Sequence, residues 1–147
     1  MRVLVVAATE LEARYVPRSL PAIVTGPGKT AAAAATAAAL AREDDPSSVL
    51  VLNVGSAGAL RDGLSGLFLP MRVLNHDLSV EPLRALGIEA VDEIELDGGD
   101  DVVLATGDSF IESGTARVEL ARRASSSTWR ASPWPMRHHE REPPSDW

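Results

Sequence analysis

The 147-residue sequence contains no cysteine, so a disulfide scaffold and a zinc site built on thiolates are both excluded. It has no cluster of lysine and arginine before residue 117, and its formal net charge is −7. Nucleic acid and anionic membranes are therefore not expected as partners, because binding to them depends on clustered basic side chains. The first apolar run ends at Glu10, too early for a signal peptide or a membrane span. We expect a soluble, cytoplasmic chain.

The sequence does contain enough apolar residues, 45%, for one modest globular domain with a core. Short runs rich in β-forming residues predict four strands, at residues 2–8, 22–25, 49–54 and 101–106. Two further segments predict helices, at residues 31–42 and 114–123. Residues 67–74 predict either an edge strand or a bulged strand, because Pro70 interrupts them. Residues 81–96 show no assignable pattern, and residues 97–100 predict a turn.

The stretch that organises the rest of the chain begins with an apolar run, Val49–Val54, which predicts a strand buried on both faces. Four small residues follow that leave peptide N–H groups open to a flat ligand: Gly55, Ser56, Ala57 and Gly58. Because ligands of open α/β sheets bind beyond the carboxyl ends of the strands, we expect a pocket here. A tight turn without a ligand explains the same residues.

Two carboxylates, Glu10 and Glu12, follow the first predicted strand. Thr9 and Glu12 have the spacing of a capping box, which is a local way to start a helix and requires no function. Alternatively, one carboxylate leaves the helix start and faces the same pocket rim as Ser56, since both follow the ends of buried strands. A carboxylate in that position is able to activate water.

Glycine-rich and polar turns follow other predicted strands. Gly26-Pro-Gly-Lys-Thr30 is not a nucleotide-triphosphate P-loop, because that motif needs a glycine where Ile23 stands. We expect instead a tight turn that lets the next helix pack closely. Asn75-His-Asp77 is explained by hydrogen bonding within a loop, and we expect no metal there because further ligands are missing.

The last predicted strand ends in Gly107-Asp-Ser-Phe-Ile111, a loop of the same kind. Phe110 is one of only two phenylalanines in the chain. Its ring either stacks on a flat heterocycle or plugs the core.

Five segments together resemble the purine nucleoside phosphorylase and nucleosidase superfamily, and most closely its 5'-methylthioadenosine/S-adenosylhomocysteine nucleosidases. They are residues 5–12, Gly26-Pro-Gly-Lys29, Asn53-Val-Gly-Ser-Ala-Gly58, Asn75-His-Asp77 and Thr106-Gly-Asp-Ser-Phe-Ile111. Their order and spacing make the resemblance more specific than any one segment. It implies a three-layer α/β fold, in which helices flank a central mixed β-sheet, and usually a homodimer.

The resemblance also implies an activity, which is hydrolysis of the N-glycosidic bond between adenine and a modified ribose, without a cofactor. Glu12 resembles the carboxylate that activates the attacking water. The substrate-binding positions are Pro27 near the 5' substituent, the loop Ser56, Ala57 and Gly58, Phe110 stacked on the purine, and Ile111, whose backbone recognises the purine edge. Phosphorylases carry an early glycine-rich, arginine-containing phosphate site where this sequence has Ala-Thr-Glu-Leu-Glu, which favours water as the nucleophile and leaves phosphorolysis as an alternative.

The resemblance ends after Arg123. The family continues there with a strand and a Met-Glu pair that holds the ribose, and later with an Asp that protonates the purine. Residues 124–147 show neither the pair nor any apolar periodicity, which predicts a disordered tail outside a domain of residues 1–123. A truncated or frame-shifted domain end explains this departure. If residues 127–131 were encoded by TCG ACA TGG AGG GCN, the frame beginning at the third base would encode Asp-Met-Glu-Gly.

Two functions of different classes follow. The first is a purine nucleosidase that is impaired in this chain, because a missing general acid typically costs about 10²- to 10⁴-fold in rate. The second is a non-catalytic remnant that at most binds purines or pairs with an intact subunit. A dinucleotide-binding domain is disfavoured, because no Gly-x-Gly-x-x-Gly follows the first strand.

Overall fold

The protein is described by a computed structural model that covers residues 2–109, 111 and 114–128. Three parallel strands form one sheet in the order β2-β1-β3, with β1 at Arg2–Ala7, β2 at Ala22–Val24 and β3 at Val49–Val54. The remaining strands form a mixed sheet, in the order β4 (Gly58–Ala59), β8 (Ser126–Thr128), β7 (Asp100–Thr106), β5 (Pro70–Asn75) and β6 (Glu93–Glu95).

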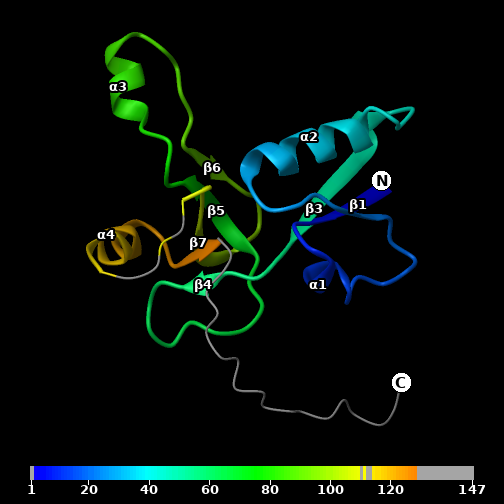
Figure 1. Ribbon diagram of the computed structural model, residues 1–147, viewed down its shortest axis with the longest axis horizontal. Helices are drawn as coiled ribbons and strands as arrows, with labels where there is room; N and C mark the ends of the chain where they lie inside the picture. The colour runs from blue at the N-terminus through cyan, green and yellow to red at the C-terminus, as the bar shows by residue number, and fades with distance from the viewer. Residues whose placement is uncertain (1, 110, 112–113, 129–147) are drawn as a thin grey trace.

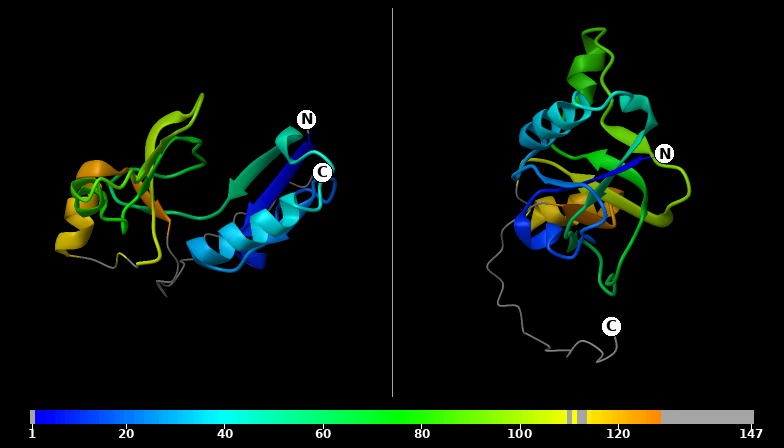
Figure 2. Two further views of the ribbon diagram at one scale, coloured as in Figure 1. Left: turned by 90° about the horizontal axis from the view of Figure 1, so that it is seen from above. Right: turned by 90° about the vertical axis from the view of Figure 1, so that its right-hand side faces the viewer.

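Helices accompany both sheets: α1 (Glu10–Ala13), α2 (Lys29–Leu40), α3 (Val80–Ala85) and α4 (Thr115–Arg123), with a 3₁₀ turn at Pro46–Ser48. In Figure 1, α2 runs beside β1 and β3, whereas α4 lies beside β7. Figure 2 shows that the chain between β3 and β4 joins the two sheets. The predicted α/β class with a mixed sheet and flanking helices is confirmed, although the strands are divided between two sheets. In the part of the chain that the structure describes, no helix is long and apolar enough to span a membrane.

Strand β1 is the centre of the three-stranded sheet and carries its core. Its valine-rich sequence pairs with β2 on one side and β3 on the other, and residues Leu4 to Ala7 are all buried. The predicted buried first strand is therefore confirmed.

A second core fills the five-stranded sheet. Side chains from the β5 and β7 strands, the α4 helix and the adjoining loops make up this cluster: Leu60, Leu74, Ala105, Leu120 and Ala124. Helix α4 presents Leu120 to this cluster, and its two last-turn arginines lie near the negative end of the helix dipole, as the sequence predicted.

The prediction for β3 is correct for the strand and wrong for its burial. Leu50, Val51 and Leu52 are 47%, 38% and 38% exposed. The reason lies in the topology: β3 is at the edge of its sheet and, among the described residues, pairs only with β1. An apolar run predicts a strand that favours burial, but it does not specify how many neighbouring strands and helices cover that strand.

Strand β5 is internal to the five-stranded sheet, between β7 and β6, so the edge-strand alternative is wrong. Its pairing with β7 shifts register between Pro70 and Arg72, which is the bulge alternative, and the bulge accommodates a residue without a backbone N–H. The segment that the sequence left unassigned, residues 81–96, includes most of α3 and all of β6, which are both too short to produce a clear periodicity.

The expected disorder from Ala124 onward is wrong for its first five residues. Ser126 and Ser127 pair with β7 on one side and with β4 on the other, and residues 124–127 are buried. Main-chain pairing holds this segment, so it needs no apolar pattern of its own. The ordered domain therefore extends at least to Thr128, and residues 129–147 lie outside the described part.

Candidate active site

A cavity of about 250 Å³ opens where the carboxyl ends of several strands meet. Its walls come from the ends of β1, β2, β3 and β7 and from the first turns of α1 and α2: residues 8, 12, 25–29, 32, 53–56, 106 and 107. Both sheets thus contribute residues to the walls of the cavity. The volume is near the lower end of the roughly 300–1,000 Å³ typical of small-molecule pockets.

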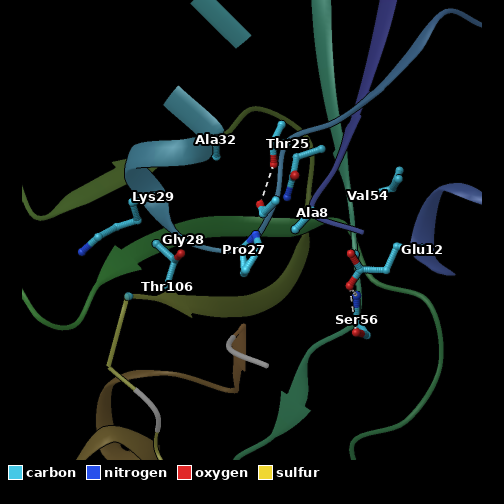
Figure 3. A pocket seen from close by; sticks show the side chains of 14 residues that line it. Ala8, Glu12, Thr25, Pro27, Gly28, Lys29, Ala32, Val54, Ser56 and Thr106 are labelled. Carbon is cyan, nitrogen blue, oxygen red and sulfur yellow. Dashed lines mark hydrogen bonds between the residues drawn. The ribbon is translucent and has the colours of Figure 1, made fainter. Parts of the chain in front are cut away.

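Glu12 and Ser56 meet on the rim of this cavity (Figure 3). The Glu12 Oε1 atom accepts hydrogen bonds from both the backbone N–H and the hydroxyl of Ser56, each at 2.9 Å. Thr9 is the N-cap residue of α1, but its hydroxyl donates to Glu12 Oε2 at 3.4 Å and makes no side-chain cap hydrogen bond, so the Thr9 half of the predicted capping box is absent. The carboxylate is therefore oriented toward the cavity by donors from two different strand ends.

Gly55 makes this approach possible. A Cβ atom at this position would lie 3.3 Å from Glu12 Oε1, closer than most side-chain contacts. The small residues after β3 thus serve to admit the carboxylate of Glu12 as well as any ligand.

Helix α2 begins at the opposite wall, directly after Pro27 and Gly28. Gly28 has a φ of 96°, a conformation that residues with a side chain rarely adopt. This tight turn is what the sequence predicted for the segment. It aims the backbone N–H of Lys29 away from the helix, where Asp108 Oδ1 accepts it at 2.8 Å.

Asp77 is the acceptor around which the loops after β5 and β7 are arranged. Its Oδ2 atom accepts the backbone N–H groups of Asp108 at 2.5 Å and Ser109 at 3.1 Å, and its Oδ1 atom pairs with the Lys29 ammonium. Partial burial raises the pKa of Asp77, but the hydrogen bonds from Lys29, Asp108 and Ser109 outweigh it, so the pKa lies below the ordinary 3.8.

The surroundings of His76, the neighbour of Asp77, favour its uncharged imidazole. Burial and the positive charge of Lys29 lower the pKa of His76 below 6.5, and the Asp77 carboxylate only partly opposes them. Its Nε2 atom is buried without a hydrogen-bond partner in the described structure. The described residues contain no group of three or more potential metal ligands.

No protein-family model and no curated protein sequence matches the chain. Solved structures do match. The 5'-methylthioadenosine/S-adenosylhomocysteine nucleosidase of Neisseria meningitidis, solved with methylthio-immucillin-A, has a TM-score of 0.66 at 21% identity over 88% of this chain and 76% of that one. The S-adenosylhomocysteine nucleosidase of Streptococcus pyogenes has 0.62 at 19% identity, over 86% and 72%. A futalosine hydrolase of Helicobacter pylori has 0.62 at 17% identity, over 87% and 79%.

The chain has the nucleosidase fold. At these identities the similarity concerns the fold, which is the one that the sequence resemblance implied. Within this nucleosidase fold, the structure brings three of the predicted site residues to the cavity: Glu12, Pro27 and Ser56.

Among the described residues, the other predicted site residues do not line this cavity, and their contacts with a substrate stay predictions. Ala57 is not among the residues that line the cavity, and Gly58 begins β4, where it pairs with Ser127. The Ile111 side chain packs against the core cluster around Leu74, while its predicted contact with the purine uses the backbone and stays a prediction. Phe110 lies outside the described residues.

The sequence analysis missed Lys29, Asp77 and Asp108 as a connected group. Once a P-loop was excluded, nothing in the sequence assigned Lys29 a phosphate-binding role. Asp77 and Asp108 had the features of ordinary loop residues. The signal that could have found them is topological: β5 and β7 are parallel neighbours, so the polar residues after both strands meet at one edge.

Proposed function

We propose that this chain is a purine nucleosidase, which hydrolyses the N-glycosidic bond of nucleosides of the 5'-methylthioadenosine and S-adenosylhomocysteine type. The observation that carries this proposal is the Glu12 carboxylate, fixed by two Ser56 hydrogen bonds on the rim of a cavity. The nucleosidase fold supports it, and so do the nucleoside analogues bound by similar structures.

In this mechanism Glu12 orients a water molecule and takes its proton. The water oxygen bonds to C1' of the ribose while the bond from C1' to the adenine nitrogen breaks. Positive charge develops on the sugar in the transition state, and a nearby carboxylate stabilises it. The adenine leaves with the electron pair of the broken bond and requires a proton on a ring nitrogen.

The remaining assignments complete the proposed site. Pro27 faces the 5' substituent, the loop from Ser56 to Gly58 and Ile111 contact the nucleoside, and the Phe110 ring stacks on the purine. The sequence has no Met-Glu pair after Arg123 to hold the ribose, so we propose that turnover is impaired. The second candidate is a non-catalytic protein that binds purines, because the same cavity is able to hold a purine without hydrolysis.

The test is adenine release from 5'-methylthioadenosine and S-adenosylhomocysteine in a coupled absorbance assay. We expect Glu12→Gln to lower kcat by about 10²- to 10⁴-fold, because the amide still accepts from Ser56 but cannot take a proton. Glu10→Gln is the matched control: it removes an exposed carboxylate of the same helix outside the cavity, and it should leave kcat unchanged.

Equal adenine release by the wild type and Glu12→Gln would overturn the nucleosidase proposal and leave the purine binder. Release that requires inorganic phosphate and yields a sugar phosphate would instead identify a phosphorylase. We further propose a cytoplasmic homodimer acting in methionine salvage, consistent with a chain without cysteine. Sedimentation velocity checks the dimer.

A further inference from the structure

A cluster of polar side chains connects the two sheets beside the cavity. It joins the start of α2, on the three-stranded sheet, to the loops after β5 and β7, on the five-stranded sheet. The backbone N–H of Lys29 donates to Asp108 at 2.8 Å, and the Lys29 ammonium donates to Asn75 Oδ1 at 3.0 Å and pairs with Asp77. Lys29 therefore makes three polar links from one sheet to the other.

Asp77 extends these links along the loop after β7. Its second oxygen accepts the N–H groups of Asp108 and Ser109, so one carboxylate holds both this loop and the Lys29 ammonium. The Lys29 and Asp77 side chains are 35% and 18% exposed, which shields the pair better than an ordinary surface ion pair.

The cluster reaches the cavity through Lys29, on the side away from Glu12. Lys29 itself lines the cavity next to Gly28, and Asp108 directly follows Gly107, which also lines it. Figure 3 shows the Lys29 ammonium pointing away from Glu12. The Lys29 ammonium thus points to Asn75 and Asp77 of the five-stranded sheet and its loop, and not to Glu12.

We propose that Lys29 is a positioning residue: through Asp77 and Asp108 it holds the two sheets at the spacing that gives the cavity its shape. The kinetic part of this inference rests on the proposed nucleosidase function. The structural part, a fixed spacing between the sheets, does not.

The expected kinetic effect is a rise in KM with little change in kcat. If removal of the ammonium leaves a tenth of the molecules with the sheets correctly placed, the apparent affinity for the nucleoside falls about tenfold, because it scales with the competent fraction. Each complex that forms still has Glu12 and Ser56 in place. A loss of folded protein would instead lower the apparent kcat.

The decisive experiment measures the spacing directly. Since the chain has no cysteine, cysteines introduced at two exposed positions, Ala38 in α2 and Glu119 in α4, accept spin labels specifically. Pulsed electron paramagnetic resonance should give a narrow distance distribution for the wild type and a broad one for Lys29→Met. Lys29→Arg, which keeps a cation of similar reach, should restore the narrow distribution and the low KM.

Asp77→Asn serves as a second variant if Lys29→Met does not fold, and circular dichroism at the assay temperature establishes which variants are folded. An unchanged narrow distribution in the folded variants would overturn the positioning role, whatever their activity. A broadened distribution in a chain that releases no adenine would support this role while counting against the nucleosidase proposal.

Discussion

At the scale of single residues, we expect His76 to make stability depend on pH. Its folded-state pKa lies below 6.5, so the unfolded chain binds a proton that the folded chain does not between these two pKa values. The stabilisation is complete above about pH 6.5 and is lost as the pH falls toward the folded pKa. Urea unfolding from pH 7.5 to 5 should show a declining free energy of unfolding.

The matched variant is His76→Gln, which keeps a polar side chain but does not titrate. The other two histidines, His138 and His139, are present in both proteins, so the difference between the two pH profiles isolates His76. Parallel profiles would show that His76 is as easily protonated in the folded state as in the unfolded one.

Among the site residues, the sequence correctly predicted the two that come after predicted strands and face the same cavity, Glu12 and Ser56. Glu12 and Ser56 come shortly after β1 and β3, and the carboxyl ends of neighbouring parallel strands meet at one edge of the sheet. The choice between a capping box and a pocket carboxylate could not be made, because it depends on where Ser56 lies in space. Gly58 and Ile111 were assigned by motif alone. Gly58 pairs with Ser127 and the Ile111 side chain packs against the core, and their contacts with a substrate stay predictions.

At the scale of elements, the end of β7 packs against the end of β5 too closely for any side chain at Gly107. A Cβ there would lie 2.6 Å from His76 Cε1 and 2.9 Å from Asp77 Oδ2. We expect Gly107→Ala to lower the free energy of unfolding by about 1–3 kcal/mol through this overpacking, measured by urea unfolding at neutral pH.

Gly58→Ala provides the control for Gly107→Ala. The nearest atom to its Cβ is the Ser127 carbonyl oxygen at 3.7 Å, an ordinary contact, so stability should change much less. If both alanines were tolerated equally, the loops after β5 and β7 would be free to separate, and the contact at His76 would not be a constraint.

The elements that the sequence could predict are those whose own composition decides them. Valine-rich β1 forms as expected because its β propensity agrees with its burial, and alanine-rich α2 forms on helix propensity, without a buried residue. Strand β8 has only Ser and Thr, and it exists because β4 and β7 supply main-chain partners on both sides. A strand's own sequence does not show which strands will pair with it. For the same reason, the sequence predicted that β3 would be buried on both faces.

At the scale of the whole molecule, the two sheets have separate cores. Leu4 to Ala7 are buried in the three-stranded sheet, while the cluster around Leu74 consists of residues of the five-stranded sheet, α4 and the adjoining loops. Several large apolar side chains are exposed on both, including Leu50 and Leu67 at 47% and 96%. Small cores with exposed apolar surface predict low stability and a tendency to associate.

We therefore expect thermal unfolding to proceed in two steps rather than one. In differential scanning calorimetry, the calorimetric enthalpy should exceed the van't Hoff enthalpy, because the sheets are joined by one chain segment and by the polar links of Lys29. Leu74→Ala removes a side chain that is 1% exposed and should destabilise one step by about 2–5 kcal/mol. Val5→Ala, also at a 1% exposed position, should shift the other step. A single sharp transition that both variants lower together would mean that the two sheets form one cooperative core, with the Lys29 links carrying stability as well as position.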